Sequence, residues 1–269
     1  MMKFDTEKIA NDFLEVASEQ RLNILTNLAE KRLNISKLAE ILDATKPEVH
    51  RNIGRLIKAG LIEKESDGNY VLTTYGKTIL VQIPSLSFIS ENKQYFVNHT
   101  LGNLETKFIQ RLGALHDKKQ INGFVKVLEK WKNIHENAEK YIYNILSEVP
   151  YSSDIIDVIS SKLENNIKIQ SIFSEKAIIT DDRKTVFQKK GFQKYVTNNI
   201  LERKIMKDVS ILVLVTDKDA AVFFTNNQGE SDFSIMFTST NSDFHEWCLD
   251  YFEWCWKNAS SFQESKLKE

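Results

Sequence analysis

Apolar side chains near the start of the chain recur every three or four residues, which is the period of a helix with one buried side. The pattern predicts a helix over residues 5–17 and a second helix that is capped by Ser18. The apolar positions of the two helices are Ile9, Ala10, Phe13, Leu14, Ala17, Leu22, Leu25 and Leu28. The chain is therefore expected to begin with two amphipathic helices.

Two shorter helices and a hairpin are predicted next. Ser36 and Thr45 carry oxygens that can accept the unpaired N–H groups at helix starts, and Pro47 suits a first helical turn, where no N–H is needed. Gly60 suits the position after a helix, because it adopts left-handed conformations easily. Residues 66–69 favour a tight turn between two short strands. This order of elements is typical of a winged helix-turn-helix.

The second helix of this motif is expected to bury Val49, Ile53, Leu56 and Ile57 on one side. Its other faces would then carry basic residues. A helix of this size fits the major groove of duplex DNA, where arginine can pair with guanine and other polar side chains can reach base edges. The motif therefore predicts that this protein binds double-stranded DNA.

The candidate DNA-binding residues are Thr45, Lys46, His50, Arg51, Arg55, Lys58 and Lys64. We expect Lys46, His50 and Arg51 to face bases or the adjacent phosphates. The three basic residues that follow them are better placed for phosphate contacts, which set the register on the duplex. Thr45 is expected chiefly as a helix cap. The alternative is that these exposed side chains are only solvated.

Residues 16–80 resemble the ArsR-type winged-helix domain that is common in archaeal and bacterial regulators. The resemblance is carried by Leu38-Ala-Glu-Ile-Leu42, by Val49-His-Arg-Asn-Ile53, by Leu56 and by Ala59-Gly-Leu-Ile62. It implies a transcriptional regulator whose second short helix reads DNA.

The chain has 269 residues, of which 42% are hydrophobic, so it is too long for one winged helix and should hold a second domain. It has no run of eighteen apolar residues and no secretory apolar core at its N-terminus, so we expect a soluble cytoplasmic protein without a membrane segment. Cys248 and Cys255 lie two helical turns apart, too far for a relaxed disulfide and without metal-ligand spacing. They are expected to be buried thiols, and neither a metal nor a cofactor is predicted.

The formal net charge is −1, but the charges are unevenly distributed. Residues 46–64 hold five basic and two acidic side chains, whereas residues 217–269 hold four basic and ten acidic ones. Charge alone does not indicate nucleic acid. A dimer of modestly basic motifs could still bind DNA through doubled phosphate contacts, and its affinity would depend on salt.

The middle of the chain reads as helical and interrupted. A short helix is expected over residues 75–81, and the pattern stays helical from residue 86 to about residue 138. These helices would connect the N-terminal motif to the rest of the chain. Their apolar faces either form a dimer interface or pack on their own chain, and the sequence leaves both options open.

From residue 140 the pattern changes to that of an α/β domain. Strand, helix and strand are expected over residues 141–147, 154–163 and 167–173, which predicts a parallel pair with a right-handed crossover. A loop is expected over residues 174–190 and a helix over residues 191–204. The remaining predicted elements are a hairpin of residues 210–216 and 220–225, a strand at 234–238 and a helix at 242–259.

This C-terminal part resembles the sensory region of archaeal regulators related to the methanogenesis and filamentation regulators. The resemblance covers most of residues 85–257. It is carried by Leu201-Glu-Arg203, Val213–Asp217, Ala220-Ala-Val222, Gly229, Asp232, Asp243–Cys248 and Phe252–Trp256. It implies a fold similar to a catalytically silent half of a phospholipase-D domain, and an archaeal transcription factor.

Catalysis is not expected. A phospholipase-D site needs a histidine nucleophile, a lysine two residues later and a second such set nearby. His116-Asp117-Lys118 is the one His-x-Lys in the chain, and Gly123 stands where an acidic residue would be needed. His245 lacks the lysine. There is no phosphate-binding glycine loop and no zinc-type cluster of histidine and cysteine.

The candidate ligand-binding residues are Arg203, Asp217, Asp232 and Trp247. Arg203 lies near a predicted strand start, and Asp217 and Asp232 lie near predicted strand ends. Together they could form a polar mouth above the sheet, with tryptophans as aromatic walls. The alternatives are that Arg203 forms an ion pair with a neighbouring acidic side chain and that the tryptophans belong to the core.

The sequence therefore predicts an α+β protein in three parts. These are a winged helix-turn-helix over residues 1–83, a helical connector and candidate dimerisation region over 84–139, and an α/β effector-sensing domain over 140–269. The predicted function is sequence-specific, DNA-binding transcriptional regulation by a homodimer that responds to a small molecule or a partner protein. The main alternative is a winged-helix adaptor that binds proteins without specific DNA binding.

Overall fold

The helix-turn-helix predicted from the apolar spacing is present in the computed structural model, which describes residues 5–147, 153–177 and 181–262. The chain divides into two units, residues 1–84 and residues 85–269, and each has its own hydrophobic core. The predicted α+β class with an N-terminal winged helix-turn-helix is confirmed. Among the described residues, no helix is long and apolar enough to cross a membrane.

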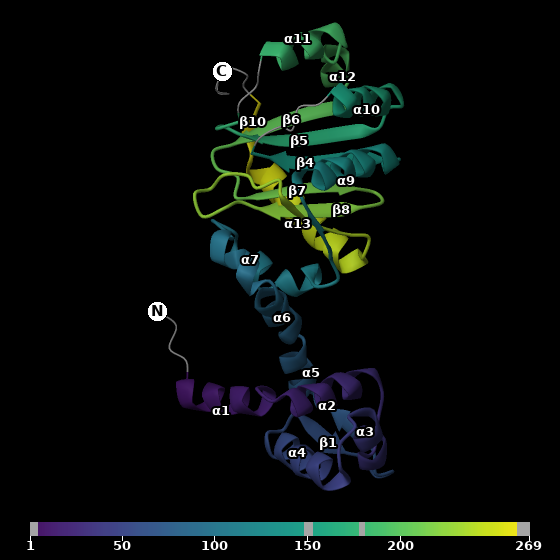
Figure 1. Ribbon diagram of the computed structural model, residues 1–269, viewed down its shortest axis with the longest axis vertical. Coiled ribbons are helices and arrows are strands. Elements are labelled where there is room, and N and C mark those ends of the chain that lie inside the picture. The colour runs from purple at the N-terminus through teal and green to yellow at the C-terminus, as the bar shows by residue number, and fades with distance from the viewer. Residues whose placement is uncertain (1–4, 148–152, 178–180, 263–269) are drawn as a thin grey trace. The chain divides into compact units, whose positions relative to one another are not determined.

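The first unit packs five helices around a short hairpin (Figure 1). Its core is formed by α2, α3, α4 and the hairpin, and includes the fully buried Ile24, Leu25 and Leu38. The hairpin is the predicted wing, with Gly68 at φ 86° in its turn. The elements are α1 (Thr6–Val16), α2 (Glu19–Glu30), α3 (Ile35–Ile41), α4 (Lys46–Lys58), β1 (Ile62–Lys64), β2 (Tyr70–Leu72) and α5 (Thr74–Leu80).

Two details of this unit differ from the sequence prediction. Ser36 lies inside α3, and the cap is Asn34, whose side chain accepts the N–H of Lys37 at 3.0 Å. In α4, Ile57 is 42% exposed, and the fourth buried position is taken by Asn52, whose amide donates to Gln20 at 2.7 Å. A polar residue can replace an apolar one there because it finds a hydrogen-bond partner.

The second unit is built on an eight-stranded sheet with the order β10-β6-β5-β4-β7-β8-β9-β3. The pairs β4–β5 and β5–β6 are parallel, and all other pairs are antiparallel. The strands are β3 (Lys119–Asn122), β4 (Tyr141–Leu146), β5 (Lys168–Ser174), β6 (Leu201–Met206), β7 (Ile211–Thr216), β8 (Ala220–Phe224), β9 (Ile235–Ser239) and β10 (Ser260–Ser261). The predicted parallel crossover between β4 and β5 is confirmed.

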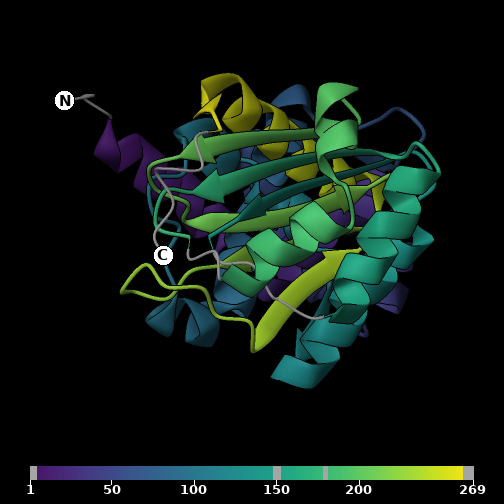
Figure 2. The same cartoon turned by 90° about the horizontal axis from the view of Figure 1, so that it is seen from above.

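Helices cover both faces of this sheet (Figure 2). Tyr143 of β4 stacks on Phe252 of α13, whereas Trp131 of α9 contacts Phe223 of β8 on the opposite face. The two cysteines of α13 are free and buried, as predicted, and burial raises the pKa of Cys255 to about 12. The main covering helices are α9 (Phe124–Asn137), α10 (Ser153–Glu164) and α13 (Ser242–Asn258).

The segment expected as a connector belongs to the second unit. Its elements are α6 (Ile83–Glu91), α7 (Lys93–Asn98), α8 (Thr106–Ile109), the 3-10 helix η1 (Leu112–Leu115), β3 and α9. Phe88, Phe108 and Leu112 of this segment lie in the unit's core. The sequence missed β3 because it has only four residues, and a period of two cannot be recognised over so short a span.

Two further elements differ from expectation. The predicted loop over residues 174–190 contains α11 (Asp181–Lys189), and residues 178–180 lie outside the described residues. The predicted helix over residues 191–204 is a short α12 (Gln193–Thr197) followed by β6. β6 was missed because its middle residues, Glu202 and Lys204 among them, are polar and half-buried, so it lacks the apolar run of a central strand.

Two glycine variants test the packing of the first unit. An added Cβ at Gly76 would overlap the backbone carbonyl of Leu61, whereas nothing lies within 4 Å of an added Cβ at Gly54. Gly76→Ala should therefore destabilise this unit by about 3 kcal/mol or more. Gly54→Ala should stabilise it by about 1 kcal/mol, because alanine favours a helix interior. Native-state hydrogen exchange of the α2 and α4 amides measures both changes, and similar protection in the two variants would contradict the packing described.

Candidate nucleic-acid interface

The helix α4 is fixed on the first unit by its buried side and by a capping box at its start. Val49, Ile53 and Leu56 are nearly fully buried. The backbone N–H of Thr45 donates to the Glu48 carboxylate at 3.0 Å, and the Thr45 side chain accepts the N–H of Glu48. The Thr45 hydroxyl also donates to the Glu48 carboxylate at 2.8 Å. Thr45 is therefore the N-cap of α4, as predicted. Gly60, at φ 72°, ends the helix as predicted.

The exposed side of α4 carries four of the candidate DNA-binding residues. With 3.6 residues per turn, Arg51 and Lys58 lie opposite the buried stripe, and Lys46 and His50 lie on one flank. All four are exposed, and none makes a hydrogen bond or ion pair with the described residues. The structure therefore brings these four side chains together on one open helix surface, with Gly54 at its centre.

Arg55 is placed differently from the other basic residues of α4. Its guanidinium donates two hydrogen bonds to the Glu15 carboxylate of α1, at 2.9 and 2.7 Å. The hydrogen bond from Arg55 is the main cause of a lowered pKa at Glu15, so this carboxylate is ionised at neutral pH. The sequence predicts a phosphate contact for Arg55, but two nitrogens of its guanidinium already donate to a carboxylate of the same chain.

The wing carries mixed charges. Lys64 is exposed on β1, 6.0 Å from the ring centre of Tyr70, and Glu63, Glu65 and Asp67 lie in the same hairpin. Arg32, which the sequence reasoning missed, reaches the wing and donates to Glu65 at 3.0 Å. The adjacent basic pair at residues 31 and 32, just before a buried leucine, was the available signal. The cationic surface of this unit therefore centres on α4 and not on the wing.

The four candidate ligand-binding residues do not form one site in the second unit. Asp217 follows the end of β7, and Asp232 precedes β9, which runs parallel to β7 because both are antiparallel to β8. The two carboxylates therefore lie at opposite ends of the sheet. Arg203 lies in the middle of β6, three strands away from β7 in the sheet order. The expected polar mouth is not formed.

Each of these side chains has a local environment that differs from a ligand site. The guanidinium carbon of Arg203 lies 4.8 Å from the ring centre of Phe187 and 4.2 Å from the ring centre of Phe262. Burial opposes ionisation of Asp217, but the N–H groups of Glu139 and Lys140 donate to it, and its pKa is lowered. Trp247 is fully buried, and its indole N–H donates to the Phe108 carbonyl at 3.2 Å. The core alternative holds for this tryptophan.

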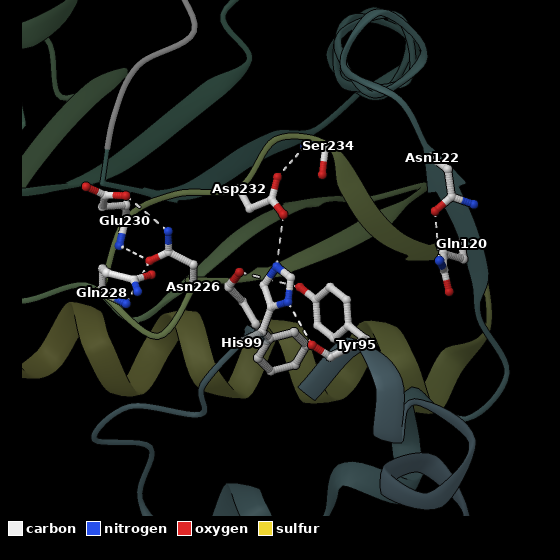
Figure 3. Close-up of polar contacts among 10 residues, drawn as sticks. Tyr95, His99, Gln120, Asn122, Asn226, Gln228, Glu230, Asp232 and Ser234 are labelled. Atoms are coloured by element: carbon white, nitrogen blue, oxygen red, sulfur yellow. Dashed lines mark hydrogen bonds and ion pairs between the residues drawn. The ribbon is translucent and has the colours of Figure 1, made fainter. Parts of the chain in front are cut away.

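Asp232 belongs to a partly buried polar contact that the sequence did not predict (Figure 3). His99 lies against the Tyr95 ring at 3.7 Å between centroids and makes two hydrogen bonds through its two ring nitrogens. One joins Nδ1 to the Tyr95 carbonyl and the other joins Nε2 to Asp232, both at 2.9 Å. The Asp232 carboxyl stays acidic in this contact, because its hydrogen bonds lower its pKa although burial opposes its ionisation. This ion pair attaches the loop before β9 to α7.

One family model matches the first unit, and no curated protein matches the chain. The model is described as the HVO_A0261 N-terminal domain and matches residues 11–92. The match extends from α1 through the helix-turn-helix and wing to the end of α6. The search of curated proteins found no match. The finer resemblance to the ArsR type stays a prediction.

Solved structures similar to the chain include an archaeal chromatin protein, the bacterial protein NucT and a phospholipase D family member. TrmBL2, an archaeal chromatin protein, is 13% identical over 91% of this chain and 94% of its own, with a TM-score of 0.41. NucT from Helicobacter pylori is 12% identical over 54% of this chain and 99% of its own, with a TM-score of 0.42. Nuc from Salmonella typhimurium, a phospholipase D family member, is 10% identical over 55% of this chain and 100% of its own, with a TM-score of 0.41.

The ion pair of His99 and Asp232 predicts a specific loss of stability in acid. Burial raises the pKa of Asp232, but hydrogen bonds from Ser234 and His99 outweigh burial, so the pKa lies below its ordinary value. The stabilisation is complete above the unfolded pKa of about 3.9 and is lost as the pH falls through the folded pKa. Asp232→Asn should therefore lower the free energy of unfolding by about 2 kcal/mol at pH 7, and this difference should shrink below pH 4.

Urea unfolding followed by tryptophan fluorescence measures this effect. All four tryptophans lie in the second unit, so their emission reports on that unit alone. Gln228→Ala, in the same loop, is the control because it removes no ionisable group. An Asp232→Asn difference that stays constant from pH 7 to pH 3 would contradict the ion pair.

Proposed function

We propose that this protein is a sequence-specific, DNA-binding transcriptional regulator that inserts α4 into the major groove. The observation that carries the proposal is the open surface of α4, where Lys46, His50, Arg51 and Lys58 are exposed and unpaired among the described residues. A rigid helix with exposed donors on one side is the arrangement that reads base edges. Arg51 and His50 are assigned to bases, and Lys46 and Lys58 to phosphates or neighbouring bases.

The regulator is proposed to act in the cytoplasm as a homodimer whose second unit responds to a small molecule or a partner protein. Two DNA-binding helices about 34 Å apart reach successive major grooves on one side of the duplex, so dimerisation doubles the phosphate contacts. The exposed side of α1 supports a dimer, because the large apolar side chains of Ile9, Phe13 and Leu14 are exposed there. A response to an effector would change the spacing of the paired helices.

We also propose that the second unit does not catalyse phosphodiester hydrolysis. The supporting observation concerns the His-x-Lys sequence. His116 Nδ1 and Lys118 Nζ both lie near the Glu91 carboxylate, at 3.4 and 3.7 Å. A phosphodiester placed between these two side chains would be repelled by that carboxylate, whereas a phospholipase-D site needs them free to hold phosphate.

The proposal is tested by replacing the two basic residues of the exposed α4 surface that lie opposite the buried stripe. Arg51→Ala combined with Lys58→Ala should weaken binding to genomic DNA fragments by about tenfold or more in 0.1 M salt and reduce the slope of log K against log salt by about 1 to 2. Electrophoretic mobility shift at several salt concentrations measures both quantities. Lys189→Ala, an exposed lysine of α11, is the control. Unchanged binding in the double variant, or a wild-type protein without any salt-dependent shift, would favour the adaptor function instead.

The pairing of Arg55 with Glu15 generates a second prediction about DNA. Glu15→Gln removes the charge that holds Arg55, so this guanidinium becomes available to a phosphate. The variant should bind DNA several-fold more tightly at low salt, and its salt slope should steepen by about 0.9, the value for one added phosphate contact. Glu7→Gln, on the same helix, removes an equal charge without touching Arg55. Equal slopes for the two variants would show that Arg55 does not reach DNA.

A further inference from the structure

The strand β3 is an open edge of the large sheet. It is the last strand in the order, and within the described residues it pairs with β9 on one side only. Three of its four residues are exposed. An uncovered edge strand presents unpaired N–H and C=O groups to any chain that approaches in an extended conformation.

The register shows which backbone groups face outward. Gly123, directly after β3, donates its N–H to the Ser234 carbonyl at 2.7 Å, so it forms a hydrogen-bonded position opposite β9. Such positions alternate along an antiparallel pair, so Lys119 and Ile121 also point their backbone groups toward β9. The backbone N–H and C=O groups of Gln120 and Asn122 then point away from the sheet. Their side chains bond to each other at 2.7 Å on one face of the strand (Figure 3).

A groove runs beside this edge, between β3 and α9. It has a volume of about 400 Å³ and is lined by the four residues of β3 and by four residues of α9. A second groove of about 330 Å³ shares Lys119, Ile121 and Lys130 with the first and continues toward β9. The edge therefore has room for the side chains of an added strand.

The groove beside β3 is positively charged. Lys119, Lys126 and Lys130 line it together with one carboxylate, that of Glu129. Lys130 is paired with Asp219 at 2.9 Å, whereas Lys119 and Lys126 form no ion pair with the described residues. This charge is complementary to acidic side chains on a partner.

Two large apolar side chains stand directly after the strand. Phe124 is 57% exposed and Val125 is 67% exposed, at the first turn of α9. Lysines on an edge can serve to prevent strand pairing, but adjacent exposed apolar side chains work against that protection. The combination favours a surface that is covered by a partner.

We propose that β3 and the groove beside it form a docking edge for an extended peptide segment that carries acidic and apolar side chains. The segment pairs with the outward backbone groups of Gln120 and Asn122 and extends the sheet by one strand. Its carboxylates face Lys119 and Lys126, and its apolar side chains cover Phe124 and Val125. Main-chain hydrogen bonds supply the affinity and the charges supply the selectivity. The edge is independent of the DNA-binding proposal.

The test uses the full-length protein and a fluorescein-labelled peptide of alternating glutamate and valine, with fluorescence anisotropy as the readout. Gln120→Pro removes one outward N–H without touching the β9 pairing, and Lys126→Glu reverses one charge. Each variant should weaken peptide binding by about tenfold, and Lys126→Glu should improve binding of a lysine–valine peptide. Lys189→Glu is the matched charge control and should bind like the wild type.

Amide hydrogen exchange gives an independent readout that electrostatic attraction alone would not change. The glutamate–valine peptide should slow exchange at Gln120 and Asn122, because a paired strand protects those N–H groups. The proposal is overturned if the peptide does not bind at concentrations up to about 1 mM. It is equally overturned if both variants bind normally, if exchange at the two residues is unchanged, or if single-stranded DNA occupies this edge while the peptide does not.

Discussion

The apolar contact of α4 with the first core determines which side chains this unit offers to a partner. Val49, Ile53 and Leu56 fix the rotation of the helix about its own axis. Because side chains three and four residues apart share a face, that rotation places Arg51 and Lys58 outward together. The capping box at Thr45 and the left-handed Gly60 fix where the helix starts and ends. Packing in the core thus determines the position of charges on the surface.

In the second unit, the directions of the strands determine at which end of the sheet each loop lies. β4 is parallel to β5 on one side and antiparallel to β7 on the other. Loops that follow the parallel strands β4 and β5 leave the sheet at one end, whereas loops that follow the antiparallel strands β7 and β8 leave it at opposite ends. Asp217 and Asp232 are separated because Asp217 follows β7 and Asp232 precedes β9, which runs parallel to β7. Asp217 accepts from the segment before β4, and Asp232 accepts from Ser234 in its own loop.

The helices and strands with a strong period could be predicted from the sequence, and the parts that depend on distant partners could not. α4, the wing and the strands β4, β5, β7 and β8 were predicted because each carries its own apolar pattern. β3 and β6 have no such pattern and are held by neighbours far along the chain. The exposed cations of α4 followed from its period, whereas the capture of Arg55 by Glu15 depends on how α1 and α4 pack.

The pairing of β3 with β9 has a consequence for synthesis of the chain. Lys119 pairs with Thr238, so the outer strand of the sheet cannot pair until residue 238 has been made. The wing, in contrast, joins Ile62 to Leu72 within one short hairpin. Contacts between neighbours in the sequence form much faster than contacts across a hundred residues. On the ribosome, the first unit can therefore complete its folding while the exposed apolar strands of the second still await their partners.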